Sequence, residues 1–320
     1  MKNIKIPITV PKSAEREYIK NFDMATRGTG RLMMFAGDQK VEHLNNDFVG
    51  KNIPDEVADP EHYFKIANKA HIGVFATQIG MVAKYGRDYP KIPYLIKVNS
   101  KTNLLTEKYK DPFSNRWLSV EDIIEFKKQS RLNIVGVGYT LYIGSWYESD
   151  MFGQAARIIY KAHQAGLISV IWIYPRGRAV QNRKNDIHLI AGGAGVALSL
   201  GADFAKVNYP YEFAGGEKTA ELFKEVVTAG GRTGVICIGG KKMANKKFLK
   251  CLENQKNISG TKGNAVGRNI YQRPLDEAVR MANAISSIIM YDYSVDDAYD
   301  IFTGKAELKP AVKGKNKINP

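Results

Sequence analysis

The chain has 320 residues, 44% of them hydrophobic and 25% charged, and no apolar run approaches the roughly 18 residues that a membrane helix needs. Its first segment lacks the apolar core and cleavage site of a secretory signal, and two cysteines, Cys237 and Cys251, are too few for a disulfide framework. These features argue against a membrane protein and a disulfide-rich secreted protein. We expect a globular protein in a reducing, cytoplasmic compartment, with no membrane partner.

The basic residues outnumber the acidic ones, 47 to 32, which gives a formal net charge of +15. A basic surface can follow nucleic-acid phosphates, and it can equally accompany a small anionic substrate. The two local concentrations, at 241–250 and 309–320, are typical of a solvated helix face and a loose end. We therefore expect no nucleic acid as a partner, and we keep a nucleic-acid or phosphoinositide binder as the alternative from another class.

Short runs rich in β-branched and aromatic residues recur along the chain, separated mostly by helical patterns. Several of these runs are too apolar to have a solvent-exposed face, which indicates a parallel sheet covered by helices. The expected strands are 31–37, 71–80, 93–100, 133–142, 167–175, 203–209, 233–240 and 261–268. The expected helices are 61–70, 121–130, 148–165, 188–201, 217–229, 245–253 and 275–290.

Eight strands alternating with helices predict a closed (β/α)8 TIM barrel of the α/β class. An open doubly wound sheet is the alternative, but the GxGxxG of a dinucleotide site is missing after the first strand, where AGDQKVEH stands. We divide the chain into an N-terminal extension at 1–30, one barrel domain at 31–295 and a basic C-terminal tail at 296–320.

A lysine in the middle of the sixth expected strand is the first functional candidate. The run ADFAKVNYP opens like a buried strand, yet a lysine is seldom buried unless it is paired or needed for chemistry. Neighbouring strands lie about 4.8 Å apart, so Lys206 and Tyr174 of the fifth strand should face one pocket. Burial, and a nearby cation such as Arg176, would lower the pKa of Lys206 and leave a neutral amine able to attack a ketone.

Three further side chains complete this candidate catalytic site. Tyr174 can move a proton, Asp38 at the end of the first strand can serve as a second acid or base, and Trp172 shares the strand face of Tyr174. The simpler interpretation is that Lys206 forms a structural ion pair with an aspartate, that Trp172 is a core residue and that Arg176 holds a loop. The residue pattern leaves both interpretations open.

Glycines and cations follow the seventh and eighth strands, as Gly239, Gly240 and Lys241 and as Gly267 and Arg268. Glycines let backbone N–H groups approach an anion, and barrels frequently bind phosphate between these two loops. Arg268 would supply a planar fork of donors and Lys241 a point charge. The glycines could also form only tight turns, but both loops carry the pattern and we favour a phosphate site.

Other chemistry has weaker support. The segment DQKVEH could offer Asp38, Glu42 and His43 to a metal, but a second cluster of ligands is absent, and we expect neither a metal nor a cofactor. Cys237 lies inside the seventh strand, where a small buried apolar residue is a better interpretation than a nucleophile.

Five segments, in order, resemble the archaeal-type class I fructose-bisphosphate aldolases. They are FAGDQKVEH, IWIYPRGRAV, HLIAGGAGVALSLGADFAKVN, CIGGKK and AVGRNIYQR, and the resemblance covers about residues 30–290. YPRG followed by GAD-x-x-K is its most specific part. The resemblance implies a Schiff-base (β/α)8 barrel that cleaves fructose 1,6-bisphosphate reversibly to dihydroxyacetone phosphate and glyceraldehyde 3-phosphate. It also implies a homo-oligomer, since the family assembles into large rings, and a phosphorylated sugar as the partner molecule.

The resemblance also implies roles for individual residues. Lys206 is similar to the family's Schiff-base lysine, Tyr174 to its proton-transferring tyrosine, Trp172 to the tryptophan beside it and Asp38 to its first-strand aspartate. The segments that hold phosphate or order the site contain Arg176, Gly239, Gly240, Gly267 and Arg268.

The chain departs from the family in two places. Many relatives carry Asp-His-Gly where this chain has Asp38, Gln39 and Lys40, so contacts to the far phosphate or the sugar hydroxyls are expected to differ. The family's acidic residue after the lysine has two candidates here, Glu212 and Glu217. The alternative function is a related Schiff-base aldolase or acetyl transferase acting on another phosphorylated ketose or dione.

Overall fold

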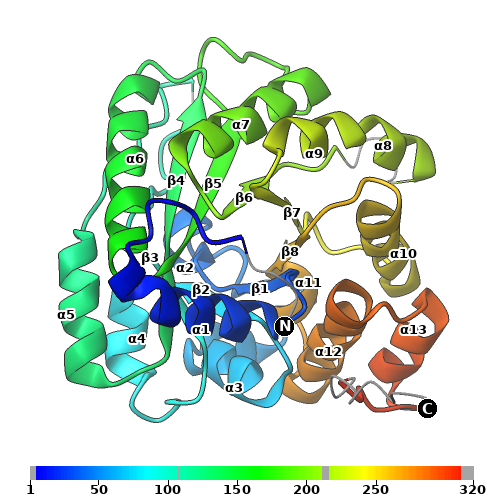
Figure 1. Ribbon diagram of the computed structural model, residues 1–320. Helices are drawn as coiled ribbons and strands as arrows, with labels where there is room; N and C mark the ends of the chain where they lie inside the picture. Colours follow the sequence, from blue (N-terminus) through cyan, green and yellow to red (C-terminus); the bar gives the residue numbers. More distant parts are fainter. Residues whose placement is uncertain (1–4, 107, 211–215, 311–320) are drawn as a thin grey trace, which may run out of the picture.

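A computed structural model describes residues 5–106, 108–210 and 216–310. Eight parallel strands close into a barrel in sequence order, each hydrogen-bonded to the next, with β8 pairing β1 (Figure 1). Their bounds are β1 Leu32–Ala36, β2 Val74–Thr77, β3 Tyr94–Lys97, β4 Ile134–Ile143, β5 Ile168–Pro175, β6 Phe204–Val207, β7 Gly234–Ile238 and β8 Gly263–Val266. All eight predicted strands and the (β/α)8 fold are confirmed.

Helices surround this barrel. They are α1 Glu15–Thr26, α2 Gln39–Glu42, α3 Glu61–Lys69, α4 Ile79–Tyr85, α5 Val120–Ser130, α6 Glu148–Gln164, α7 Ile187–Leu200, α8 Glu217–Leu222, α9 Lys224–Gly230, α10 Asn245–Asn257, α11 Arg268–Tyr271, α12 Leu275–Tyr291 and α13 Val295–Thr303, with short 3₁₀ turns at Lys12–Ala14 and Asp55–Ala58. Each predicted helix is present, although the one expected at 217–229 is interrupted at Phe223.

Helices α1, α2, α4, α11 and α13 were not predicted. The segment 71–80 was expected to be one strand, but β2 ends at Thr77 and α4 begins at Ile79. Helix α1 lies in the segment assigned to the N-terminal extension, and α13 packs on α12 within the segment assigned to the tail. The domain division itself stays a prediction, and residues 311–320 of the basic tail lie outside the described part of the chain.

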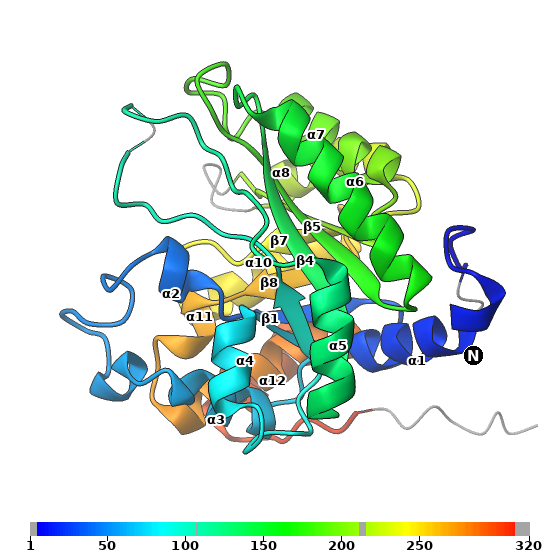
Figure 2. The same cartoon turned by 90° about the vertical axis from the view of Figure 1, so that its left-hand side faces the viewer.

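The barrel has two layers of core because its strands are buried on both faces. One cluster of apolar side chains fills the inside and includes Trp172 and Phe204, and α1 contributes Tyr18 and Ala25 to it. The larger cluster lies between the strands and the outer helices. Helix α1 lies on the opposite side of the barrel from α2, so it covers the end where the strands begin (Figure 2).

The barrel closes where β1 meets β8, with Leu32 opposite Gly263. Gly263 has a φ of +149°, and a Cβ added there would lie 1.9 Å from the backbone oxygen of Leu32. Only glycine adopts this conformation at so close a strand approach. The register of closure therefore depends on this one residue.

Polar side chains are buried at the end covered by α1. Asp203 accepts hydrogen bonds from the hydroxyl of Tyr18 at 2.5 Å and from the backbone N–H of Ser169 at 2.7 Å, and the Nε2 atom of His163 lies 3.1 Å from it. The other ring nitrogen of His163 lies 2.6 Å from the hydroxyl of Thr9. These bonds connect the N-terminal segment to the strand starts.

Candidate active site

The opposite end of the barrel, where the strands terminate, contains a cavity of about 1140 Å³. In (β/α)8 barrels this end carries the chemistry, because the loops that follow the strands meet there. The structure brings nine of the ten predicted site residues to its wall: Asp38, Tyr174, Arg176, Lys206, Gly239, Gly240, Lys241, Gly267 and Arg268. The tenth, Trp172, does not line the cavity: it is buried on β5, two residues before Tyr174.

Lys206 lies on β6 directly opposite Trp172 of β5, and 5% of its surface is exposed. Its Nζ atom is 4.8 Å from the centroid of the Trp172 ring. Burial lowers the pKa of Lys206, and the positive charge of Lys97 lowers it further, against the opposing effect of the Asp38 and Glu42 carboxylates. The cation that assists is thus Lys97, where the sequence suggested Arg176.

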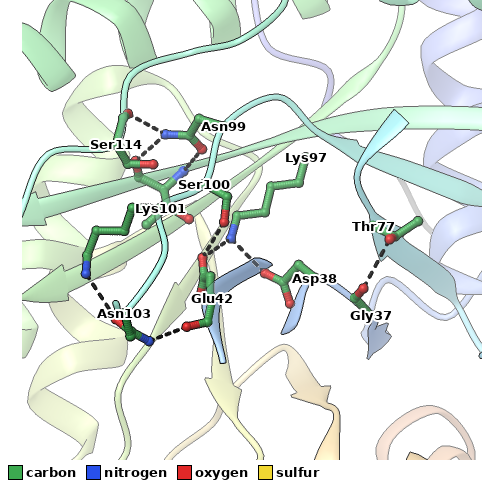
Figure 3. Close-up of polar contacts among 11 residues, drawn as sticks. Gly37, Asp38, Glu42, Thr77, Lys97, Asn99, Ser100, Lys101, Asn103 and Ser114 are labelled. Carbon is green, nitrogen blue, oxygen red and sulfur yellow. Dashed lines mark hydrogen bonds and ion pairs between the residues drawn. The ribbon is translucent and has the colours of Figure 1, made fainter. Parts of the chain in front are cut away.

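Lys97, at the end of β3, is a second lysine buried inside the barrel. Its Nζ atom donates to Asp38 at 2.7 Å and to Glu42 at 2.5 Å, and lies 5.4 Å from the Trp172 ring centroid (Figure 3). These two carboxylates raise the pKa of Lys97 although burial alone would lower it. The structural ion pair that the sequence suggested for Lys206 is therefore formed by Lys97, and Lys206 pairs with no described carboxylate.

Asp38 is a buried carboxylate at the end of β1. Burial alone would raise the pKa of Asp38, but the charges of Lys97 and Lys206 hold it well below its usual range. Asp38 is consequently an anion between two lysines of opposite character, one protonated by its ion pairs and the other with a lowered affinity for its proton.

Glu42, the last residue of α2, is a site residue whose role the sequence did not assign. Its carboxylate accepts from Lys97 and, at 3.2 Å, from the hydroxyl of Ser100. Its backbone oxygen accepts from the side chain of Asn103, whose own oxygen accepts from Lys101 at 3.1 Å. Figure 3 shows these contacts joining α2 to the segment after β3. They hold the Glu42 carboxylate in place, and its negative charge acts on Tyr174.

Tyr174 lies two residues beyond Trp172 on β5 and is half-buried in the cavity wall. Burial, and then the negative charges of Glu42 and Asp38, raise the pKa of Tyr174 well above its usual value. The phenol therefore keeps its proton across the neutral range. It is suited to donate a hydrogen bond or a proton to a group in the cavity.

Cations collect on the β3 and β5 side of the cavity, beyond Tyr174. The guanidinium of Arg176 lies 5.8 Å from the Tyr142 ring centroid, and the Nζ atom of Lys101 lies 5.7 Å from the same centroid. Burial and the nearby charge of Arg176 lower the pKa of Lys101 to about 8. Arg176 and Lys101 follow β5 and β3, and β3 lies across the barrel from β7.

The glycines after β7 and β8 form the other end of the cavity. Gly240 has a φ of +66°, which favours glycine, and a Cβ on Gly267 would lie 2.5 Å from the side-chain nitrogen of Gln39. Arg268 reaches the same end, with its Nε atom 3.8 Å from a carboxylate oxygen of Asp47. Backbone N–H groups and cations thus face one end of the cavity, as expected for an anion site.

The remaining candidates lie elsewhere. Among the described residues no group of three potential ligands could hold a metal, and His43 contacts Asp47 instead of joining Asp38 and Glu42. Cys237 is fully buried, and burial raises the pKa of its thiol well above the usual value. Glu217 begins α8 and does not line the cavity, and Glu212 lies outside the described residues. No helix of the described chain has the length and apolarity to span a membrane.

The chain is similar in sequence to known proteins. The sequence pattern of the DeoC/LacD family of aldolases matches residues 32–273. A Methanocaldococcus jannaschii protein named fructose-bisphosphate aldolase/6-deoxy-5-ketofructose 1-phosphate synthase is 54% identical over 95% of this chain and 96% of its own. The class 1 fructose-bisphosphate aldolase of Thermoproteus tenax is 34% identical over 81% of this chain and 90% of its own.

Solved structures agree with these sequence relatives. The fructose-bisphosphate aldolase of Slackia heliotrinireducens superposes with a TM-score of 0.92 at 48% identity, covering 96% of both chains. An archaeal fructose-1,6-bisphosphate aldolase, solved with its catalytic lysine bound to a carbinolamine intermediate, gives a TM-score of 0.72 at 32% identity, covering 85% of this chain and 99% of that one. This chain therefore belongs to the DeoC/LacD aldolase family, among the relatives of the archaeal class I fructose-bisphosphate aldolases that its motifs resemble.

Proposed function

We propose that the protein is a class I fructose-bisphosphate aldolase that cleaves fructose 1,6-bisphosphate reversibly through a Schiff base on Lys206. One observation carries the proposal: Lys206 is buried against Trp172, has a lowered pKa and forms no ion pair with a described carboxylate, while the neighbouring Lys97 takes the carboxylates. A neutral amine at the wall of a cavity is the group that carbonyl addition requires.

The reaction follows from this arrangement. The Lys206 amine adds to the C2 ketone, and loss of water gives an iminium ion. The C3–C4 bond then breaks: the C4 hydroxyl loses its proton to a base, the aldehyde forms, and the bonding electron pair moves to the iminium to give an enamine. Protonation at C3 and hydrolysis release dihydroxyacetone phosphate and free the amine.

Two groups are available for these proton transfers. Tyr174 keeps its proton because its pKa is raised, and it faces the cavity beside Lys206, so we assign it the leading acid and base role. Asp38, an anion near the lysine, stabilises the developing iminium charge and serves as the second base. Trp172 orients the amine from below, and Lys97 prevents Asp38 from binding Lys206.

A bisphosphate needs two anion sites, and the cavity offers one at each end. Gly239, Gly240, Gly267 and Arg268 hold one phosphate, with Lys241 nearby. Arg176 faces the opposite end, where the second phosphate lies in this proposal. The phosphorylated sugar is thus the partner molecule. We propose a metal-independent enzyme that interconverts hexose and triose phosphates in the cytoplasm, in glycolysis and gluconeogenesis.

The test is reductive trapping. We expect borohydride to fix dihydroxyacetone phosphate, and then fructose 1,6-bisphosphate, on Lys206 and not on Lys97, which serves as an internal control because its ion pairs keep it protonated. Peptide mapping identifies the labelled lysine. Chelation should leave the cleavage rate unchanged. An adduct on neither lysine of the folded protein would overturn the proposal and return attention to the basic surface.

A second reaction has specific support. The Methanocaldococcus jannaschii relative, at 54% identity, has a printed name that includes 6-deoxy-5-ketofructose 1-phosphate synthase. In this chain Gln39 and Lys40 replace the His and Gly of many relatives, and Gln39 lines the cavity. If dihydroxyacetone phosphate labels Lys206 but the bisphosphate does not, a related Schiff-base reaction on another phosphorylated ketose becomes the better assignment.

We also propose a homo-oligomer. Large apolar side chains are exposed beside the cavity mouth, on the loops after β3 and β4, and such a patch is typical of an interaction surface. They are Leu104, Leu105, Tyr109, Trp117, Trp146 and Tyr147. Light scattering of the purified protein gives the mass that tests this, and a monomer at micromolar concentration would contradict it.

A further inference from the structure

One buried amide side chain connects the two glycine-containing loops of the cavity. Asn269 is the second residue of α11, directly after Arg268, and 1% of its surface is exposed. Its Nδ2 atom donates to the backbone oxygens of Gly239 at 2.9 Å and Lys241 at 3.2 Å. Its Oδ1 atom accepts from the backbone N–H of Met243 at 3.3 Å. All three partners belong to the loop after β7.

These bonds fix the direction of two peptide groups. In a trans peptide the C=O and the following N–H point in opposite directions, and the described chain has no cis peptide. With the Gly239 and Lys241 oxygens turned to Asn269, the N–H groups of Gly240 and Lys242 point away from it. Within the described chain neither N–H donates to a protein acceptor.

The loop that carries these N–H groups forms part of the cavity wall. Gly240 and Lys242 both line it, whereas Asn269 does not. Gly240 is partly exposed and Lys242 is exposed at this wall, so both N–H groups are open to an anion in the cavity. Gly267 and Arg268 of the following loop line the same end.

We propose that Asn269 is a positioning residue for substrate phosphate: it orients the Gly240 and Lys242 N–H groups toward the anion and ties the loop after β7 to the one that carries Arg268. Asn269 does not touch the substrate in this arrangement. The inference deepens the proposed function and rests on its phosphate site. It predicts that changing Asn269 affects phosphate recognition and leaves carbonyl addition at Lys206 intact.

The direct test is Asn269→Asp, which keeps the size of the side chain but replaces a donor to two carbonyls with an acceptor. Repulsion should turn both peptides. We expect the dissociation constant for inorganic phosphate, measured by calorimetry, to rise about tenfold or more, as the loss of one or two backbone bonds to an anion implies. KM for fructose 1,6-bisphosphate should rise by a larger factor than kcat falls.

Dihydroxyacetone separates positioning from general damage because it has the ketone and no phosphate. We expect borohydride to trap it on Lys206 equally in the wild type and in Asn269→Asp. Trapping of dihydroxyacetone phosphate at limiting concentration should fall in the variant. A merely structural role for Asn269 would lower both by the same factor.

Asn99 provides a matched control. It is fully buried, and its Nδ2 atom donates to the backbone oxygens of Ser114 at 2.7 Å and Thr140 at 2.8 Å while its Oδ1 atom accepts from the Thr140 N–H at 2.7 Å. Asn99→Asp therefore creates the same electrostatic conflict on the other side of the barrel. We expect it to lower the thermal midpoint and to leave the affinity for inorganic phosphate unchanged.

The outcomes separate the two proposals. Wild-type phosphate affinity in folded Asn269→Asp overturns the inference, and if that variant does not fold, the same result for the neutral Asn269→Ser overturns it. Absence of phosphate binding by the wild type also overturns it, while a Lys206 adduct with dihydroxyacetone would leave the Schiff-base chemistry standing. If Asn269→Asp loses phosphate affinity but no ketone forms an adduct on Lys206 of the wild type, the role of Asn269 is supported and the aldolase function is rejected.

Discussion

The two lysines inside the barrel differ in protonation because of their neighbours. Lys97 has two carboxylates within hydrogen-bond distance, and Lys206 has none among the described residues. Burial disfavours an ammonium group unless an anion compensates for the lost hydration. The same side chain is therefore a paired cation on β3, whereas on β6 it has a lowered pKa and, in our proposal, is the reactive amine.

Changing Lys206 to Met should abolish cleavage and preserve the fold. Activity should fall at least about a thousandfold, because the covalent step is lost.

The pKa of Lys206 is lowered in the folded state, so the unfolded chain binds an extra proton in the pH range between that lowered pKa and 10.5. The free energy of unfolding of the wild type should therefore rise with pH across this range. Urea unfolding across this range should show the rise in the wild type and a smaller one in Lys206→Met. Equal slopes would contradict a lowered pKa.

Lys97→Met should shift the pH dependence of trapping. Removing this cation leaves Asp38 and Glu42 unpaired, and both carboxylates raise the pKa of Lys206. The trapping rate with dihydroxyacetone phosphate should therefore begin to rise at a higher pH than in the wild type. Lost pairing should also cost about 3–5 kcal/mol of stability. Lys97→Arg, which keeps the charge, is the control, and an unchanged pH profile in Lys97→Met would contradict this account.

Sequence and structure can be compared most directly at the site. Lys206 was predicted because a lysine interrupts an apolar run, and PYLIKVNS carries the same signal at Lys97. The sequence does not reveal the role of Lys97, because the carboxylates that pair with it are distant along the chain. Its partners Asp38 and Glu42 come from the end of β1, and only closure of the barrel brings them to β3.

The strands were easier to predict than the helices because nearly all their residues are buried and several of them read as continuous apolar runs. Helix α1 has many charged residues, and its low overall apolarity hides it although Gly28, with a positive φ, follows its left-handed C-cap Arg27. Helix α4 follows β2 after one residue, and its Ile79 and Val82 extend the apolar run of the strand. In both segments, packing against the rest of the barrel and not the local sequence pattern determines that a helix forms.

The β1–β8 junction should be the least tolerant element contact. Gly263→Ala places a Cβ 1.9 Å from the Leu32 oxygen, so we expect a loss of roughly 3 kcal/mol or more in the free energy of unfolding. Gly192→Ala is the control, since Gly192 lies exposed in α7 with no atom within 4 Å of an added Cβ. It should stabilise by up to about 1 kcal/mol. Equal thermal midpoints for the two variants would contradict the role of Gly263.

At the scale of the whole molecule, stability and chemistry occupy opposite ends of the barrel, as this fold generally arranges them. The buried network of Asp203, Tyr18 and His163 joins α1 to the starts of β5 and β6, and none of the three residues lines the cavity. We therefore expect that substitutions in this network lower the stability of the fold without changing the geometry of the cavity.

Asp203→Asn tests this separation. It replaces a carboxylate that accepts from Tyr18 and Ser169, so we expect a loss of roughly 3 kcal/mol in stability. Because none of these residues lines the cavity, kcat and KM at a temperature well below the midpoint should stay at wild-type values. Calorimetry and steady-state kinetics on the same preparation provide both readings. A fall in kcat with unchanged stability would show that the two ends are coupled.

The position of Trp172 has a practical consequence. The protein has three tryptophans, of which Trp117 and Trp146 are 51% and 87% exposed, whereas Trp172 is 1% exposed with the Lys206 amine 4.8 Å from its ring. Replacing Trp117 and Trp146 with Phe would leave the buried indole as the only one. Its fluorescence would then report the charge beside that ring, so the proposed conversion of the Lys206 amine to an iminium ion can be followed optically in the unlabelled protein.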